Sequence, residues 1–473
     1  MKYQYHLIII GGGSAGLVAA SGGSSLGAKI CLIESNKMGG DCLNYGCVPS
    51  KAFLRSAHLA KEINNSSKLG FESSIEKIDL KKIMSRVKAK IAQIAPHDSV
   101  ERFTKMGVDV KIGKGEIIDN HTVKVNDELL SAKSILIATG SYPRVPQIPG
   151  LDKVEFLNNE NIFDLEKLPE HLIIIGGGPI GLELGQGFKN LGSAVTIIDH
   201  NDKLFPKDDP EVWPLMKKVF EEDGIKFVFK TSVKSIEQKG NTKKINLEDE
   251  KGSIECDAIL VSAGRIPDLN CLGGNKLNID ITSRGFVKTN AKLQTNVGNI
   301  YAAGDVTGPF QFTHMAGYHG GIIVQNAILG LIKKKVDYSS VPWTTYTSPE
   351  VAHVGYTEPW AKQEKLFVRA IKIDFAEIDR AITEDDEGFI KLILGKKNRI
   401  IGATIVGAKA GEMIPLATLA IKQKLSPSAF SGLIFSYPTE AEIYKFTSFQ
   451  LMRESFKPWM KNLIKLILPK TMD

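Results

Sequence analysis

The sequence predicts an α/β protein made of several domains. A chain of 473 residues is too long for one hydrophobic core, and a typical size of roughly 150 residues per domain suggests about three. Hydrophobic residues make up 43% and charged residues 24%, which is typical of a folded globular protein. A pattern of strand, glycine turn, helix and strand occurs twice, near residues 5–34 and 171–199. Such units are typical of parallel sheets covered by helices.

Charge and cysteine content limit the kinds of partner and compartment. The net charge of +7 comes from 60 basic and 53 acidic residues spread along the chain, which argues against a nucleic-acid partner. Five cysteines, an odd number, argue against a disulfide framework and indicate a reducing compartment, so we expect a cytoplasmic protein. The uncharged stretch 3–28 contains seven glycines and four serines, so it is not the apolar run of a signal anchor. We expect no transmembrane span.

The two copies of the repeat share their spacing. The glycines are Gly11, Gly13 and Gly16 in LIIIGGGSAGL and Gly176, Gly178 and Gly181 in LIIIGGGPIGL. An acid, Glu34 or Asp199, follows eighteen residues after the last glycine of each copy. In such loops the glycines allow a tight turn and close approach of a pyrophosphate, the helix N-terminus binds the phosphates, and the acid bonds a ribose hydroxyl. One glycine triplet could serve packing alone, but two copies in register predict two dinucleotide sites.

A cysteine pair follows the first copy. In GGDCLNYGCVPSKA, Cys42 and Cys47 are five residues apart, and Lys51 lies one helical turn beyond Cys47. This spacing is not a zinc pattern, because metal sites need a second pair or nearby histidines, so we expect no metal site. The motif resembles the disulfide motif of the group I pyridine nucleotide-disulfide oxidoreductases, the family of glutathione reductase, dihydrolipoamide dehydrogenase and mercuric reductase.

The resemblance extends from the first strand to about residue 446. Further landmarks follow in the family's order: ILIATGS at 135–141, SAGRIPD at 262–268, IYAAGDVTG at 300–308 and WTTYTSPEVAHVGYTE at 343–358. The resemblance implies a homodimer with two Rossmann-like FAD/NAD(P)-binding domains and a C-terminal α+β dimerisation domain. The expected boundaries are 1–150 for the first part of the FAD domain, 151–269 for the NAD(P) domain, 270–340 for the second part of the FAD domain and 341–473 for the dimerisation domain.

The resemblance also implies roles for individual residues. Cys47 is the sulfur against the flavin, and Cys42 is the interchange thiol that attacks the substrate. Lys51 pairs with Glu183 and supplies a cation that favours the thiolate. Further implied cofactor-binding residues are Thr139, Gly140, Gly264 and Asp305, the last of which bonds the ribityl chain of FAD. His314 is either near the flavin or a cap or core histidine, and the remaining cysteines, Cys31, Cys256 and Cys271, are expected to be structural.

One motif departs from the family. Thiol-reducing members carry His-Pro-Thr-x-x-Glu near the C-terminus, with the histidine as acid and base, whereas this chain has SYPTEAE with Tyr437 and Glu442. The last histidine is His353, so no neighbouring histidine replaces it. A tyrosine, with a reference pKa of about 10, is a poor base at neutral pH. Mercuric reductase also has tyrosine there, but it uses a second cysteine pair in its tail, and nothing after Cys271 is a cysteine. Alternatively, Tyr437 fills the site without a proton role.

These observations predict an FAD-dependent enzyme that passes electrons from NADH through FAD and the cysteine pair to a disulfide, metal ion, quinone or other small acceptor. Asp199 favours NADH, because it accepts from a 2′-hydroxyl and repels a 2′-phosphate, while His200 and Lys203 keep NADPH as the alternative. A narrower rival is dihydrolipoamide dehydrogenase, which Tyr437 argues against. From another class, a non-catalytic nicotinamide-sensing or membrane-attached protein is the alternative.

The segment 457–469 has the pattern of a basic amphipathic tail. Lys457, Lys461 and Lys465 recur every four residues, and an apolar stripe is formed by Trp459, Leu463, Leu466 and Ile467. Such a helix suits docking on protein, for example the partner subunit, which we favour. Peripheral contact with the inner membrane face is the alternative.

Overall fold

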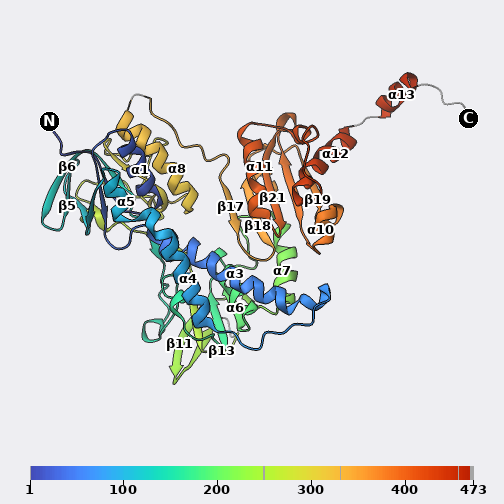
Figure 1. Cartoon of the computed structure of the whole chain (residues 1–473), viewed down its shortest axis with the longest axis horizontal. Helices are drawn as coiled ribbons and strands as arrows, with labels where there is room; N and C mark the ends of the chain where they lie inside the picture. Colours follow the sequence, from blue (N-terminus) through green and yellow to red (C-terminus); the bar gives the residue numbers. More distant parts are fainter. Residues whose placement is uncertain (1, 249–250, 331, 456–457, 469–473) are drawn as a thin grey trace, which may run out of the picture. The chain divides into compact units, whose positions relative to one another are not determined.

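The computed structural model describes residues 2–248, 251–330, 332–455 and 458–468 (Figure 1). The chain forms two compact units. The first consists of Met1–Asp202 and Asp223–Asp337, and the second of Lys203–Glu222 and Tyr338–Asp473. The mixture of parallel and antiparallel sheets with helices confirms the predicted α/β class.

A seven-stranded sheet dominates the N-terminal part of the first unit. Its strands are β1 (Tyr5–Ile10), β2 (Ile30–Glu34), β3 (Asp109–Ile112), β4 (Gly115–Ile117), β5 (Thr122–Val125), β6 (Glu128–Ile137) and β16 (Ile300–Ala302). They lie in the order β3-β2-β1-β6-β5-β4, with β16 also paired to β6. Strands β3, β2, β1, β6 and β16 pair in parallel, whereas β4 and β5 form an antiparallel extension on the first half of β6.

The helices of this part of the unit include those that pack on the sheet and those that carry the cysteine motif. They are α1 (Ser14–Ser25), α2 (Gly40–Asn44), α3 (Cys47–Asn64), α4 (Leu80–Ile94), α5 (Val100–Lys105) and α8 (Thr313–Ile323). Helices α1 and α8 pack side by side on one face, where Leu7 and Ile9 of β1 enter the core (Figure 1). Ile8 and Ile10 belong to the core on the other face. The uninterrupted apolar run of β1 is therefore explained by a strand that is buried on both faces.

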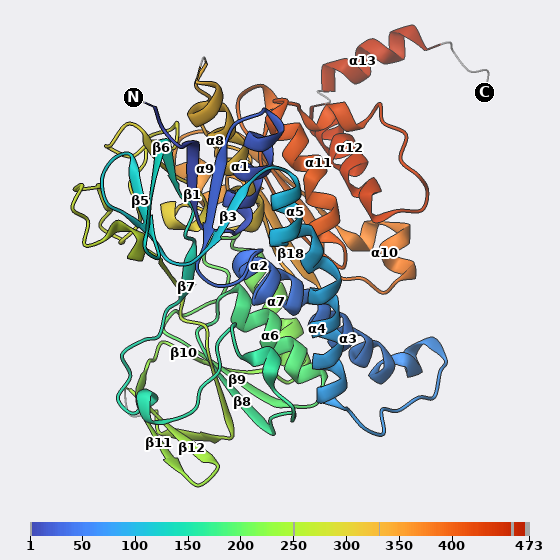
Figure 2. The same ribbon diagram turned by 60° about the vertical axis from the view of Figure 1, so that its left-hand side comes forward.

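A second parallel sheet lies in the same unit. Its strands are β8 (His171–Ile175), β9 (Ala194–Asp199), β10 (Lys226–Phe229) and β14 (Ala258–Val261), in the order β10-β9-β8-β14. Helix α6 (Pro179–Asn190) packs on β9 and lies beside α3, which also packs on α4 (Figure 2). The smaller sheets consist of β11 (Val233–Lys239), β12 (Thr242–Leu247) and β13 (Ser253–Cys256), and of β7 (Ser141–Pro143) with β15 (Arg265–Pro267).

The second unit is built on a five-stranded antiparallel sheet. Its strands are β17 (Pro342–Thr345), β18 (Glu350–Gly355), β19 (Arg369–Asp374), β20 (Phe389–Leu394) and β21 (Ile400–Gly407), in the order β17-β18-β21-β20-β19. Its helices are α7 (Val212–Glu222), α9 (Glu358–Gln363), α10 (Asp379–Thr383), α11 (Ala410–Lys422), α12 (Ile443–Ser455) and α13 (Pro458–Ile467). Apolar residues of the strands, α11 and α12 form one core.

The segment Lys203–Glu222 joins the second unit, although the sequence placed it inside a continuous stretch 151–269. A buried lysine gives the physical reason. The Nζ of Lys391 on β20 lies 3.0 Å from Asp209 and 2.7 Å from Glu211, and also 2.7 Å from Glu358 on α9. A buried ammonium group needs such partners. The other predicted boundaries remain predictions.

Within the described residues, no helix has both the length and the apolarity needed to cross a bilayer. The predicted tail is partly described as α13, in which Trp459 and Ile467 are exposed. Lys457 lies outside the described residues, as do the side chains of Lys461, Lys465 and Leu466.

Candidate active site

Two helices of the first unit position the cysteine pair. Cys42 lies in the short helix α2, and Cys47 is the first residue of α3, where the positive end of the helix dipole favours a thiolate. Both are free thiols in this structure. A hydrogen bond from the Cys42 thiol lowers the pKa of Cys47 to about 6, against the opposing effect of burial, and the same hydrogen bond raises the pKa of Cys42. At neutral pH the pair therefore holds one proton, on Cys42.

An ion pair between α3 and α6, the helix that follows the second glycine loop, lies close to the cysteines. Lys51, one turn along α3 from Cys47, lies 2.8 Å from Glu183 on α6, whose side chain is 7% exposed. The Lys51 charge lowers the pKa of Cys47, whereas the Glu183 charge raises it. The structure thus brings together all four residues that the sequence linked through the family resemblance.

A threonine that the sequence analysis missed completes the thiol environment. Thr313, the first residue of α8, has its Oγ1 3.5 Å from Cys47 Sγ, and this contact also lowers the pKa of Cys47. The next residue, His314, was the candidate predicted from the sequence; it is exposed and stacks on Phe312 with ring centroids 5.2 Å apart. The one sequence signal for Thr313 was its position, shared with His314, at the start of the helix that follows Asp305.

Both glycine loops fit a dinucleotide. Gly11 has a φ of +116°, and a Cβ there would lie 2.2 Å from the Ala138 carbonyl oxygen, so only glycine is accommodated. At the second glycine of each triplet the space is open: among the described residues, a Cβ on Gly13 would meet nothing closer than 3.9 Å, and one on Gly178 nothing within 4 Å. This is the room that a pyrophosphate needs against bare backbone. The backbone of both loops therefore fits the phosphates of FAD and of a nicotinamide nucleotide.

The two acids brace these loops in the same way. Glu34 accepts a 2.7 Å hydrogen bond from the Gly12 amide, and Asp199 accepts one of the same length from the Gly177 amide. Glu34 accepts a second from the Asn36 amide, and Asp199 one from the Asn201 amide. Both acids are nearly buried. Each carboxylate is thus held at the mouth of its loop, where the family's ribose contact would be made.

A polar network surrounds Asp305, the residue that the resemblance assigned to the ribityl chain. Ser141 donates to Asp305 at 2.7 Å, and Arg265 donates to the Ser141 Oγ at 2.8 Å. Burial raises the pKa of Asp305, while the Ser141 hydrogen bond and the Arg265 charge oppose that rise. Arg265 also lies 3.3 Å from Asp41, next to Cys42. No role was predicted from the sequence for Ser141, Arg265 or Asp41.

The remaining residues that the resemblance implied follow two strand ends: Thr139 and Gly140 come after β6, and Gly264 comes after β14. Gly140 and Gly264 have φ values of +75° and +99°, and at neither position would a Cβ meet a described atom within 4 Å. The Thr139 hydroxyl donates to the Asp268 carbonyl at 2.6 Å. The three unassigned cysteines, Cys31, Cys256 and Cys271, are buried, and burial raises the pKa of each thiol to about 12.

The residues of the departing C-terminal motif lie in the second unit. Tyr437 is 70% exposed and donates a 2.9 Å hydrogen bond to Asp379 of α10. That hydrogen bond raises the pKa of Tyr437. Glu442 is half-buried in the 3-10 turn Glu440–Glu442 directly before α12, and it is not the carboxylate that bonds the phenol. The loop before Tyr437 exposes Ile434 completely.

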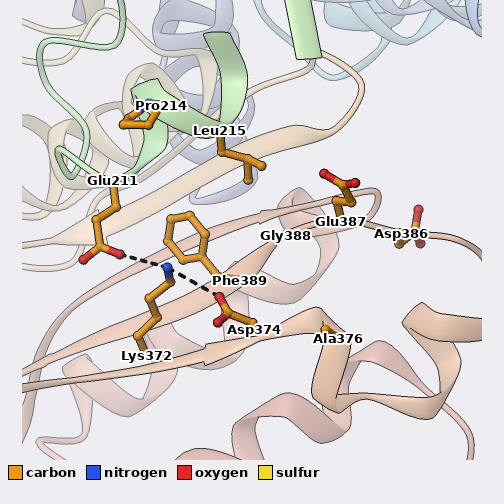
Figure 3. A pocket seen from close by; sticks show the side chains of 10 residues that line it. All are labelled: Glu211, Pro214, Leu215, Lys372, Asp374, Ala376, Asp386, Glu387, Gly388 and Phe389. Atoms are coloured by element: carbon orange, nitrogen blue, oxygen red, sulfur yellow. Dashed lines mark ion pairs between the residues drawn. The ribbon is translucent and has the colours of Figure 1, made fainter. Parts of the chain in front are cut away.

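The second unit also contains a pocket of about 510 Å³ between α7 and strands β19 and β20 (Figure 3). Lys372 is flanked there by Glu211 at 3.0 Å and Asp374 at 3.4 Å, and its ammonium group lies over the Phe389 ring. None of the residues predicted from the sequence as site residues lines this pocket. In the part of the chain that the structure describes, no group of three or more His, Cys, Asp or Glu side chains is arranged to hold a metal ion.

Two dinucleotide loops and a polarised thiol pair in one unit define a nucleotide-dependent thiol–disulfide oxidoreductase. Residues 5–320 match the pyridine nucleotide-disulphide oxidoreductase domain, and residues 341–447 match the dimerisation domain of the same proteins. The chain belongs to the pyridine nucleotide-disulphide oxidoreductase family. It is therefore an enzyme that uses FAD and NAD(P)H, as the resemblance predicted, and its matched dimerisation domain supports a homodimer.

Individual relatives agree with this membership. Mercuric reductase from Staphylococcus aureus is 35% identical over 443 residues, which cover 93% of this chain and 81% of that protein. Dihydrolipoyl dehydrogenase from Chlamydia trachomatis is 34% identical over 453 residues, or 94% of this chain and 96% of that one. Among solved structures, LpdA from Mycobacterium tuberculosis is similar with a TM-score of 0.87 and 27% identity, covering 94% and 99% of the two chains. The HOCl-induced flavoprotein disulfide reductase RclA from Escherichia coli is similar with a TM-score of 0.84 and 28% identity, covering 93% and 99%.

Proposed function

We propose that Cys42 and Cys47 are the redox centre of this enzyme. Two electrons and one proton convert the disulfide into a Cys47 thiolate and a Cys42 thiol, and the reverse step delivers both electrons to the acceptor. The single observation that carries the proposal is that Cys47 lies at the N-terminus of α3 beside its hydrogen-bonding partner Cys42, with the Lys51–Glu183 ion pair one helical turn away. Lys51 stabilises the thiolate, and Glu183 orients Lys51.

FAD, when bound, supplies two-electron transfer between the nicotinamide and the cysteine pair. The residues proposed to hold it are the glycines of the first loop with Glu34, Thr139, Gly140 and Asp305. The second loop with Asp199 and Gly264 is proposed to hold the nicotinamide nucleotide. The open backbone at Gly13 and Gly178 supports both assignments.

NADH is the proposed electron donor. Asp199 keeps a carboxylate at the mouth of the second loop, and a 2′-phosphate would meet its negative charge. NADPH remains the alternative through His200, which is exposed beside Asp199. Steady-state kcat/KM for both nucleotides tests the proposal: we expect at least about a tenfold preference for NADH. A wild-type preference for NADPH would overturn the proposed role of Asp199.

The proposed electron acceptor is a metal ion, or another acceptor whose reduction needs no catalytic base at position 437. Asp379 accepts a hydrogen bond from the Tyr437 hydroxyl and raises the pKa of Tyr437, so the phenol stays protonated at neutral pH and cannot replace a catalytic histidine. Relatives named mercuric reductase, and the Cu(II) complex described for RclA, make metal ions the first acceptors to assay. A disulfide or quinone is the next class to assay.

The rival activity is dihydrolipoamide oxidation with NAD. We expect slow turnover of dihydrolipoamide by the native enzyme and about a hundredfold or greater gain in Tyr437→His, because general acid–base catalysis is worth roughly 100- to 10,000-fold. Rapid native turnover would defeat the proposed effect of the missing histidine. An acceptor screen under NADH, run in parallel with Cys42→Ala, separates thiol-dependent reduction from direct reduction by the flavin.

The C-terminal tail and the location of the enzyme are narrower proposals. The described part of α13 exposes Trp459, Leu463 and Ile467, which supports an apolar contact with protein or, as the alternative, with a membrane surface. We place the enzyme in the cytoplasm, because a thiol pair that must be reduced suits a reducing compartment. Co-sedimentation with vesicles of anionic lipid separates the two proposals for the tail: docking on protein predicts that no enzyme is recovered with the vesicles.

A further inference from the structure

Asp41, the residue before Cys42, receives two side-chain contacts from a distant part of the first unit. Asn159 Nδ2 donates to Asp41 Oδ1 at 3.0 Å, and Arg265 Nη2 lies 3.3 Å from the same oxygen. Asn159 is 6% exposed and the Arg265 side chain 14%, so both partners are largely shielded from water. Such contacts are stronger than those of a fully exposed pair.

The same residue is tied to the whole loop between the two cysteines. The backbone carbonyl of Asp41 accepts from the Tyr45 amide at 2.8 Å, and Asn159 Nδ2 also lies 3.4 Å from the Tyr45 carbonyl. A Cβ on Gly46, the residue before Cys47, would lie 3.0 Å from Asp41 Oδ2. Asp41 and Asn159 therefore hold residues 41–46 together, a segment that contains Cys42 and directly precedes Cys47.

The two partners of Asp41 lie in segments bonded to other sheets of the first unit. Leu157, two residues before Asn159, exchanges backbone hydrogen bonds with Ile259 and Val261 of β14 in the second parallel sheet. Arg265 lies in β15, which pairs with β7, and its Nη2 also donates to the Ser141 carbonyl at 2.7 Å. The segment 41–46 is thus connected to two other sheets and not only to its neighbours in sequence.

We propose that Asp41 is a positioning residue that sets the redox potential of the Cys42–Cys47 pair, by clamping the loop between the two sulfurs to Asn159 and Arg265. This inference rests on the proposed function of the cysteine pair. A disulfide is favoured when its two thiols are held at high effective concentration, because the ring then closes at little entropic cost. Loosening the clamp lets the reduced loop explore more conformations, which favours the dithiol and makes the potential more positive.

The test uses the full-length, FAD-loaded protein equilibrated in dithiothreitol redox buffers, with the fraction of alkylated Cys42 read by mass spectrometry. We expect Asp41→Asn to lower the disulfide formation constant about tenfold, a shift of ~30 mV toward positive potential for a two-electron couple. Asn159→Ala, which keeps every charge, should lower it about threefold, and it decides the question where Asp41→Asn does not load FAD. Glu160→Gln is the matched control, because Glu160 is an exposed acid beside Asn159, and its formation constant should stay at the wild-type value.

A formation constant that stays within twofold of wild type in both Asp41→Asn and Asn159→Ala would overturn the clamp. The proposed function fails separately, if NADH does not reduce the pair in the wild-type enzyme. Because dithiothreitol opens the disulfide without NADH, the clamp is measured whichever way that second experiment ends.

Discussion

The two glycine loops share one frame and differ at one informative position. In both, an acid at the end of the second strand accepts a 2.7 Å hydrogen bond from a loop amide, that of Gly12 or of Gly177. Two residues past the last glycine, the first loop has Val18 and the second has Glu183. Val18 is 41% exposed and packs beside Gly320 of α8, whereas Glu183 is 5% exposed and pairs with Lys51. The glycines and the acid that both loops share serve nucleotide binding. Only the second loop has, in addition, a buried acid that connects it to α3, the helix that begins at Cys47.

The strongest test of this comparison removes the thiols and leaves both loops intact. Cys42→Ala and Cys47→Ser should each lower thiol-dependent turnover at least about 1000-fold, because no second thiol remains to carry the electron pair. FAD content and NADH binding should stay at wild-type values. Cys256→Ala, at a buried cysteine of β13, is the control and should keep its activity. If both active-site variants kept their turnover, the reaction would not need the cysteine pair.

Substitution of the second glycine in each loop separates the two nucleotides. A Cβ fits the protein at both Gly13 and Gly178, so Gly13→Ala and Gly178→Ala should fold with unchanged melting temperatures of the apoprotein. The methyl group occupies the space of the pyrophosphate, and an obstruction of that size costs on the order of a hundredfold. Gly13→Ala should weaken FAD binding by that factor, measured by flavin fluorescence. Gly178→Ala should instead raise the KM for NADH, and equal effects of both variants on FAD would contradict the assignment.

Breaking the Lys51–Glu183 pair from either side should have opposite effects. Lys51→Gln removes a cation that lowers the pKa of Cys47, and Glu183→Gln removes an anion that raises it. The thiolate absorbance of the reduced enzyme should therefore titrate at higher pH in the first variant and at lower pH in the second. At neutral pH, turnover should fall about tenfold in Lys51→Gln. Lys61→Gln, on the same helix but paired with Asp223, should leave the titration unchanged.

The smallest expected effect concerns Thr313. Thr313→Val removes the hydroxyl 3.5 Å from Cys47, so the pKa of Cys47 should rise slightly and turnover below neutral pH should fall about threefold. Thr313→Ser, which keeps the hydroxyl, should restore the wild-type pH profile. A loss in both variants would indicate a packing role and not a hydrogen bond to the thiol.

Local patterns predicted much of this molecule. The repeat, the CxxxxC motif and the distance from Lys51 to Cys47 are all spacings within one short segment, and strands and helices preserve such spacings. The resemblance linked Lys51 to Glu183, 132 positions apart, because the family keeps that pair. It also supplied Asp305, which physical pattern alone does not identify.

The missed residues are those whose roles depend on tertiary contacts. Asp41, Asn159 and Arg265 lie in separate segments, and only the fold brings the side chains of Asn159 and Arg265 to the Asp41 carboxylate, at 3.0 and 3.3 Å. Asp379 likewise bonds Tyr437 across 58 positions. Lys391 likewise pairs with Asp209 of the segment Lys203–Glu222, although in the sequence it looks like any surface lysine. Short polar pairs of this kind leave no periodic signal.

The most direct test of the account is a pH titration of the thiolate-to-flavin absorbance in the two-electron-reduced, FAD-loaded enzyme. Since the pKa of Cys47 is lowered to about 6, the thiolate exists above that pH and is lost as the pH falls through it. We predict a long-wavelength band that disappears with a midpoint near pH 6. Cys42→Ala has no disulfide and is titrated with its flavin oxidised; its midpoint should be higher, because it lacks the donated hydrogen bond. A band that is absent at every pH, or one that titrates near the ordinary thiol value of about 8.5, would contradict the account.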